Sequence, residues 1–221
     1  MLDSVSTSDD VPEGMNPDAA ATWPPRELID SWLGGADLDF EFRPGEESDI
    51  PLDDTVRVAA ARRFRDVLGR FASGVTVVTS TSNDEPVGMT CQSFSSVSLD
   101  PPLVLFCPAK TSRAWPRIQR SGRFCVNLLA HDQSELSNTM ACRGTDKFAG
   151  LDWGPSPATG SPIFDGVLGY VDCTIHAVHE AGDHFIVVGR VLELDVTDVP
   201  HPLLFFRGQY SRPEQRPRFG G

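Results

Sequence analysis

The sequence predicts a mostly β fold, a largely antiparallel barrel with a few short helices. Segments with the apolar pattern of strands dominate residues 75–210, and short turns separate them. Few segments carry helical periodicity, so the chain lacks the helices that the crossovers of a parallel sheet require. A repeat of roughly 20–50 residues, the mark of a solenoid or propeller, is absent from the sequence.

The folded body is predicted over residues 56–211 and begins with a helix over 58–71. An apolar stripe at helical spacing defines this helix: Ala60, Phe64, Val67, Leu68 and Phe71. Strands follow over 75–80 and 87–92. The polar residues of 82–86 predict a turn between them.

Two further strands are predicted over 94–99 and 103–107, separated by an Asp-Pro-Pro turn. A short helix over 112–119 follows, and we expect Pro116 to interrupt it because proline lacks an amide hydrogen. Residues 124–129 have the composition of a buried strand.

The next helix is expected to run from Asp132, as N-cap, to Ala141, with Glu135 at the capping-box position. Residues 143–160 are rich in glycine and proline and predict a loop. Long strands over 167–179 and 184–196 form a predicted hairpin around residues 180–183.

Residues 203–210 close the predicted body, and residues 212–221 predict a flexible tail. The opening 55 residues are rich in Asp, Glu, Pro, Gly and Ser, which predicts a disordered acidic extension. Within it, residues 25–33 have the pattern of a short helix with one apolar face. This segment is either a transient helix in a solvated tail or a docking helix for the body or for a partner protein.

Charge and composition exclude several classes of protein. The net charge of −12 lies entirely in residues 1–60, with 15 acidic residues against three arginines, whereas residues 61–221 are neutral. Such a chain lacks the basic face of a general nucleic-acid binder. It has neither a twenty-residue apolar stretch nor a secretory signal, so we expect no membrane span and a cytoplasmic location.

The five cysteines predict neither a zinc finger nor a disulfide framework. Their number is odd, their spacing is wide and no CxxC pair occurs. We expect most of them to be small buried hydrophobic residues in a reducing cytoplasm. They are Cys91, Cys107, Cys125, Cys142 and Cys173.

Motifs of the common enzyme classes are absent from the sequence. It contains no GxGxxG, no GxxxxGK[ST], no HExxH and no GxSxG, which removes support for a Rossmann domain, a kinase or a hydrolase. His176, His179 and His184 lie close in sequence. The first two face opposite sides of a strand, and no acidic or thiol ligand completes a set, so we expect no metal site.

Two segments and one histidine are candidates for ligand binding. Residues 90–98 carry five hydroxyl side chains and an amide, which suits a planar polar ring or an exposed strand edge. Residues 110–113 place a cation and hydroxyls before a short helix, a pattern typical of an anion or phosphate site. His184 shares a strand face with Arg190, where the two could receive an anionic aromatic ligand. It could equally be a structural histidine.

Five blocks in order resemble the flavin reductase-like family over about residues 60–211. They are FRDVLGRFASGVTVVTS, PVGMTCQSFSSVSLDPPLVLFCPAKTSRAW, GRFCVNLLA, GDHFIVVGRV and LLFFRGQYS. The chain is most similar to the small NAD(P)H:flavin oxidoreductase components of two-component monooxygenases. The acidic extension lies outside this resemblance.

The resemblance implies a split β-barrel homodimer that binds FMN or FAD without a Rossmann fold. It implies that the isoalloxazine ring lies against Thr90, Cys91, Gln92, Ser93, Phe94 and Ser95. It implies that the ribityl phosphate lies near Cys107, Lys110, Thr111, Ser112 and Arg113. Further flavin or nucleotide contacts are implied for Asn127, Leu128, Leu129, Lys147, Phe148, Arg207 and Tyr210, and a catalytic position beside the nicotinamide for His184.

The implied reaction is hydride transfer from C4 of NADH or NADPH to N5 of the flavin, after which reduced flavin is supplied to a partner oxygenase. The cofactors carry this chemistry, so it requires no protein nucleophile. Two alternatives stay open. One is a one-component flavoenzyme on the same barrel, and the other is a non-catalytic flavin-binding module.

Overall fold

The computed structural model describes residues 55–142 and 146–213. The predicted extension up to residue 54, its helix at 25–33 and the end of the predicted tail therefore lie outside the described residues. In chain order the elements are α3 (Thr55–Leu68), β1 (Ser73–Gly74), β2 (Thr76–Ser82), β3 (Glu85–Cys91), β4 (Ser95–Leu99), β5 (Pro102–Phe106), α4 (Ala114–Ser121), β6 (Arg123–Leu128), α5 (Ser134–Ala141), β7 (Trp153–Pro155), β8 (Pro162–Phe164), β9 (Gly169–Ala181), β10 (His184–Val196), β11 (Leu204–Phe206) and β12 (Gln209–Ser211).

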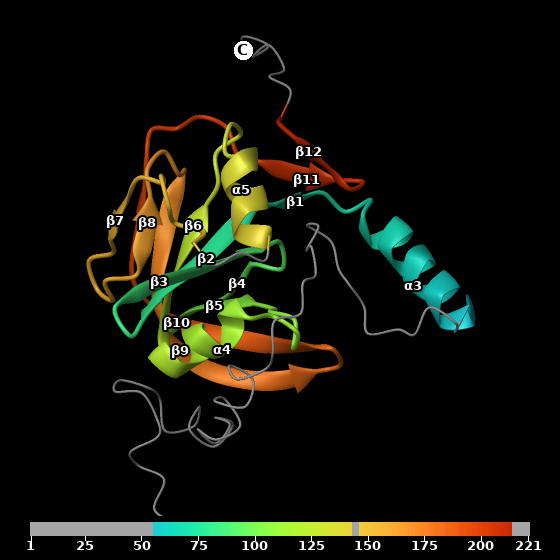
Figure 1. Cartoon of the computed structure of the whole chain (residues 1–221), viewed down its shortest axis with the longest axis horizontal. Coiled ribbons are helices and arrows are strands. Elements are labelled where there is room, and N and C mark those ends of the chain that lie inside the picture. The colour runs from blue at the N-terminus through green and yellow to red at the C-terminus, as the bar shows by residue number, and fades with distance from the viewer. Residues whose placement is uncertain (1–54, 143–145, 214–221) are drawn as a thin grey trace, which may run out of the picture.

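The predicted mostly β, antiparallel architecture is confirmed (Figure 1). Seven strands form one sheet in the order β3-β2-β6-β9-β10-β5-β4, and every neighbouring pair in it is antiparallel. The edge strands β3 and β4 are consecutive in the chain, and only residues 92–94 join them. Because four Cα–Cα steps span at most about 15 Å, the sheet curves until the ends of its two edges lie close together.

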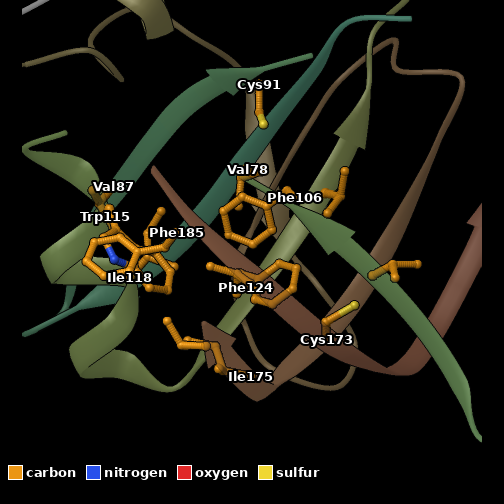
Figure 2. Close-up of a cluster of buried hydrophobic side chains, with 14 residues drawn as sticks. Val78, Val87, Cys91, Phe106, Trp115, Ile118, Phe124, Cys173, Ile175 and Phe185 are labelled. Atoms are coloured by element: carbon orange, nitrogen blue, oxygen red, sulfur yellow. The ribbon is translucent and has the colours of Figure 1, made fainter. Parts of the chain in front are cut away.

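The concave side of this sheet encloses the larger core (Figure 2). The ring of Phe106 packs edge-on against Phe124 at a centroid distance of 5.0 Å and against Trp115 at 5.9 Å. Trp115 and Ile118 enter the core from one face of α4, so this helix closes one side of the curved sheet.

A second core lies on the other face of β2 and β6. It joins Val77, Leu129, Met140 of α5 and Phe164 of β8, all buried. Since alternate residues of β2 enter different cores, both faces of this strand are buried. The sheet is thus the middle layer between the α4 side and the side of α5 and the β7–β8 hairpin.

Some predicted elements differ in detail. Pro116 does not interrupt α4, because it is the third residue of the helix, where amide hydrogens have no intrahelical partner. Asp132 is not the N-cap of α5. Gln133 takes that position, and its side-chain oxygen accepts from the Ala130 amide at 2.9 Å.

Two predicted boundaries also change. Residues 153–155 of the predicted loop form β7, which pairs with β8. Residues 203–210, which close the predicted body, form most of a hairpin, because Arg207 and Gly208 both have positive φ and turn the chain between β11 and β12. The long β9–β10 hairpin is confirmed, with Gly182 and Asp183 as its turn.

Three of the five thiols are buried, as predicted for most of them, whereas Cys107 is half-buried and Cys142 is exposed. Burial raises the pKa of the Cys125 and Cys173 thiols, and the nearby Asp172 carboxylate adds to the effect. Within the described residues, no helix is long and apolar enough to cross a membrane.

Candidate functional site

The link between the two edges of the sheet is held by Ser93. Its hydroxyl accepts from the Cys107 amide at 2.8 Å and lies 3.1 Å from the Cys91 sulfur. Three predicted flavin residues from β3, the link and the end of β5 therefore meet at one point. Burial raises the pKa of the Cys91 thiol, which keeps it protonated and unsuited to act as a nucleophile.

The other predicted ring-binding residues differ in how far they are buried. Gln92 and Phe94 are half-buried, and Phe94 packs against the core. Ser95 is exposed. The Thr90 hydroxyl donates to the Ser137 carbonyl of α5. The segment thus keeps Ser93 and Ser95 exposed, while Thr90 and Phe94 fix it to the body.

The predicted phosphate segment lies beside β3. The Ser112 hydroxyl accepts from the Trp115 amide at 3.2 Å, which caps the first turn of α4, and it donates to the Met89 sulfur at 3.7 Å. Thr111 and Arg113 are exposed on the same turn. The start of α4 is therefore anchored to the strand that leads into the predicted ring-binding segment.

The tip of the β9–β10 hairpin is joined to this phosphate segment. The Lys110 amide donates to the Asp183 carbonyl at 2.9 Å, and the Phe185 amide donates to the Pro108 carbonyl at 2.9 Å. Ala109 and His184 form a β-bridge. Two predicted site residues 74 positions apart, Lys110 and His184, are consequently neighbours in space.

Side-chain contacts reinforce this junction. His184 Nδ1 lies 2.8 Å from Asp183 Oδ1, and this hydrogen bond holds the pKa of the Asp183 carboxyl below its usual range. Lys110 Nζ lies 3.0 Å from Glu180 Oε2 and 5.5 Å from the centre of the Phe185 ring. The junction therefore carries two cationic or ionisable groups, each paired with a carboxylate.

The β6 residues lie deeper than the link. Asn127 is fully buried, and its amide nitrogen donates to the Val77 and Pro162 carbonyls while its oxygen accepts from the Phe164 amide. Leu129 is buried in the second core, whereas Leu128 is half-buried against the first. The structure does not bring the Asn127 and Leu129 side chains to the surface of the site.

Lys147 and Phe148 support the α5 side. Lys147 Nζ donates to the Met140 carbonyl at 2.8 Å, and burial lowers the pKa of this lysine to about 8. The Phe148 ring stacks on Phe164 at 5.4 Å and lies against Gly88, where a Cβ would come within 3.3 Å of it.

Arg207 and Tyr210 lie on the β11–β12 hairpin. Arg207 is exposed, and its amide donates to the Gly69 carbonyl. The Tyr210 hydroxyl contacts Ser137 Oγ at 2.9 Å and Asn138 Oδ1 at 2.8 Å, and burial raises its pKa. Ser137 thus connects Tyr210 to Thr90, which sequence reasoning did not foresee because no motif marks this serine.

The sequence analysis also missed Glu180 and Asp183, which lie at the junction of the Lys110 segment with the tip of the β9–β10 hairpin. Asp183 had a signal in the sequence, its position in the predicted turn beside His184, whereas Glu180 is recognised only from its contact with Lys110. Among the residues the structure describes, no group of three or more His, Cys, Asp or Glu side chains could hold a metal ion.

Comparison with known proteins identifies the family. The sequence profile of the flavin reductase like domain matches residues 68–214. The chain belongs to the flavin reductase-like family. It is 53% identical over 152 residues to the reductase subunit HsaB of a flavin-dependent monooxygenase from Mycobacterium tuberculosis, covering 68% of this chain and 81% of that protein. It is 44% identical over 152 residues to the FMN reductase (NADH) SmoA from Agrobacterium fabrum, covering 69% and 86%.

Solved structures of the same family are similar to this fold. Nitrilotriacetate monooxygenase component B from Mycobacterium thermoresistibile matches with a TM-score of 0.70 and 50% identity, over 75% of this chain and 94% of that one. The NADH:FAD oxidoreductase SgcE6 from Streptomyces globisporus, in complex with NAD and FAD fragments, matches with a TM-score of 0.66 and 33% identity, over 79% and 100%.

Proposed function

We propose that this chain is an NAD(P)H:flavin oxidoreductase that supplies reduced FMN or FAD to a partner oxygenase. The observation that carries the proposal is the junction of the Lys110 loop with the His184 strand beside the hydroxyl-rich link at 92–94. Such a junction places groups suited to a phosphate, a nicotinamide and a flavin ring within one region. Membership of the flavin reductase-like family supports the same activity.

The residues of this region fit a flavin. The exposed hydroxyls of Ser93 and Ser95, with the backbone of the link, are donors and acceptors for the polar edge of the isoalloxazine ring. Lys110, Thr111 and the capped start of α4 suit the ribityl phosphate, because a helix start and a cation both attract an anion. The bound flavin would supply N5 as the hydride acceptor.

His184 is proposed to face the nicotinamide. Its imidazole is one-third exposed at the hairpin tip, and Asp183 holds Nδ1. This hydrogen bond restricts rotation of the ring, which leaves Nε2 to orient the second ligand over the flavin. The protein's contribution to hydride transfer is then to stack and align the two rings.

The remaining predicted residues are proposed to support the site indirectly, by fixing the residues and strands that form it. Asn127 and Leu129 hold β6 in place through their buried contacts, and the Phe148 ring packs against Gly88 of β3. Tyr210 steadies Thr90 through Ser137. For Lys147 and Leu128 the same supporting role follows from their contacts with α5 and the core.

We also propose that the active species is a homodimer with the curved sheet as a split barrel. Helix α3 leaves the body (Figure 1), and its apolar side chains are exposed, with Phe64 63% and Val67 57% accessible. An apolar helix face of this kind is stabilised by a second copy of the chain. Arg207, next to the end of α3, is then placed to reach a nucleotide near the interface. A reaction that consumes NAD(P)H fits the cytoplasm.

The test is oxidation of NADH and of NADPH by purified protein, each with FMN, FAD, riboflavin or no flavin. We expect turnover that saturates with free flavin. Residual oxidation without added flavin, together with flavin that stays bound through purification, would instead indicate a one-component flavoenzyme. Flavin binding with no oxidation of either nicotinamide would contradict the proposal and favour a binding module.

His184→Gln tests the assigned residue. We expect kcat/KM for the nicotinamide to fall by about tenfold to hundredfold while the Kd for flavin, measured by fluorescence quenching, is unchanged. His179→Gln, on the same hairpin but exposed away from the junction, is the matched control. Equal losses in both variants would contradict the assignment of His184.

A further inference from the structure

The Lys110 side chain already has an anionic partner within this chain. Its ammonium lies 3.0 Å from the carboxylate of Glu180, which is near the end of β9 at the hairpin tip. Both side chains reach solvent, with 37% and 77% of their surface accessible. A phosphate that approaches Lys110 therefore meets an ammonium that a carboxylate already occupies.

Lys110 does not depend on Glu180 for its position. Its backbone amide is fixed by the Asp183 carbonyl, and its ammonium lies over the face of the buried Phe185 ring at 5.5 Å. The other carboxylate at this junction, Asp183, is held by His184 Nδ1. Glu180 is thus the carboxylate that pairs directly with the Lys110 ammonium, while the Phe185 ring offers that ammonium a second favourable contact.

We propose that Glu180 determines how tightly the site holds a phosphate-bearing flavin, by competing with the phosphate for Lys110. This inference rests on the proposed function, in which Lys110 faces the ribityl phosphate. Because the Lys110 ammonium must give up the Glu180 carboxylate before it can pair with a phosphate, the competition weakens phosphate binding. The result suits a reductase whose reduced flavin must leave for another enzyme, since weaker phosphate binding speeds release.

The competition is specific to the phosphate. FMN carries the phosphate and riboflavin lacks it, whereas the two share the same ring and ribityl chain. Removing the Glu180 charge should therefore lower the Kd of FMN and leave the Kd of riboflavin unchanged. Because the pair is exposed, the expected effect is about twofold to fivefold, and it should shrink at about 0.5 M salt.

The experiment measures the Kd of FMN and of riboflavin by quenching of flavin fluorescence, without nicotinamide. The full-length wild type is compared with Glu180→Gln and with Glu193→Gln, a control on the exposed far end of β10, about 30 Å along the strand. We expect Glu180→Gln to lower the Kd of FMN alone and Glu193→Gln to change neither. Thermal unfolding of each variant verifies that the fold is kept.

Lys110→Met separates competition from a general charge effect. In that background Glu180→Gln should no longer alter the Kd of FMN, because the shared partner is gone. An unchanged or raised FMN Kd in Glu180→Gln, an equal change for riboflavin, or a gain that persists with Lys110→Met would each overturn the inference. Flavin binding without nicotinamide oxidation would instead overturn the proposed function, and these binding data would still decide the role of Glu180.

Discussion

The Phe124 ring lies against the backbone of Gly189, in the space that a Cβ on residue 189 would fill. Phe124 is on β6 and Gly189 on β10, two strands that β9 separates in the sheet. The register of β9 and β10 also shifts beside Gly189. A bulge and a glycine together bend the strand, so the aromatic core can fill the concave side of the sheet.

Gly189→Ala is therefore expected to destabilise the protein. The new Cβ would overlap the Phe124 ring, and overpacking of a core costs about 1–3 kcal/mol, which corresponds to a fall in Tm of about 3–10 °C. Gly154→Ala is the control, since a Cβ on Gly154 would meet no atom within 4 Å. Equal Tm values for Gly189→Ala and wild type in calorimetry would contradict this packing argument.

Local pattern was sufficient to predict most strands, but not every connection. The β9–β10 hairpin could be predicted because two long apolar segments flank a glycine-containing turn. The β11–β12 hairpin could not, because its turn begins at Arg207, whose positive φ is unusual for that residue type. Periodicity likewise identified the apolar stripe of α3, but it carries no information on what covers that stripe.

The site follows from sheet order, which is not a local property. Neither Lys110 nor His184 carries a signal that they are neighbours. Their contact arises because β5 pairs with β10 and the chain after β5 continues along the hairpin tip. The resemblance to the family supplied both residues in advance, whereas Glu180 and Ser137 become visible only through the contacts they make.

Asp172 anchors the loop before β8, and Asp172→Asn should weaken it. The buried carboxylate accepts from the Ala158 and Thr159 amides at 3.0 and 2.9 Å and from the Thr159 hydroxyl at 2.6 Å. An amide group in its place turns one acceptor into a donor that faces other donors. We expect a loss of about 2–3 kcal/mol in the free energy of unfolding by urea. Asp165→Asn, with an exposed side chain, is the control, and similar losses in both would contradict the prediction.

Lys147 should make stability depend on pH in the alkaline range. Below about pH 8 both the folded and the unfolded chain carry its proton, and the cost of burying the charge is present in full. Between pH 8 and the ordinary lysine value of 10.5, the unfolded chain binds more protons than the folded one. The free energy of unfolding therefore rises with pH through this window.

The measurement compares wild type with Lys147→Met by urea unfolding across that window. Relative to the variant, wild type should gain about 1–3 kcal/mol between pH 8 and 10.5. Groups that titrate in both proteins cancel in this difference. A difference that stays constant with pH, or that favours the variant more at high pH, would show that Lys147 is not the group responsible.

The exposed face of α3 supports a prediction about assembly. Phe64 and Val67 are 63% and 57% accessible, and side chains of this size each contribute about 1.5–3 kcal/mol when buried. If a second copy covers them, Phe64→Glu with Val67→Glu should raise the dimer Kd by more than about 100-fold. Light scattering after gel filtration should then give the 24.1-kDa mass of one chain, against twice that mass for wild type.

Arg62→Glu, an exposed charge change on the opposite face of the helix, should leave the dimer intact. A wild-type mass of one chain, or dissociation by Arg62→Glu as well, would contradict an interface on this face.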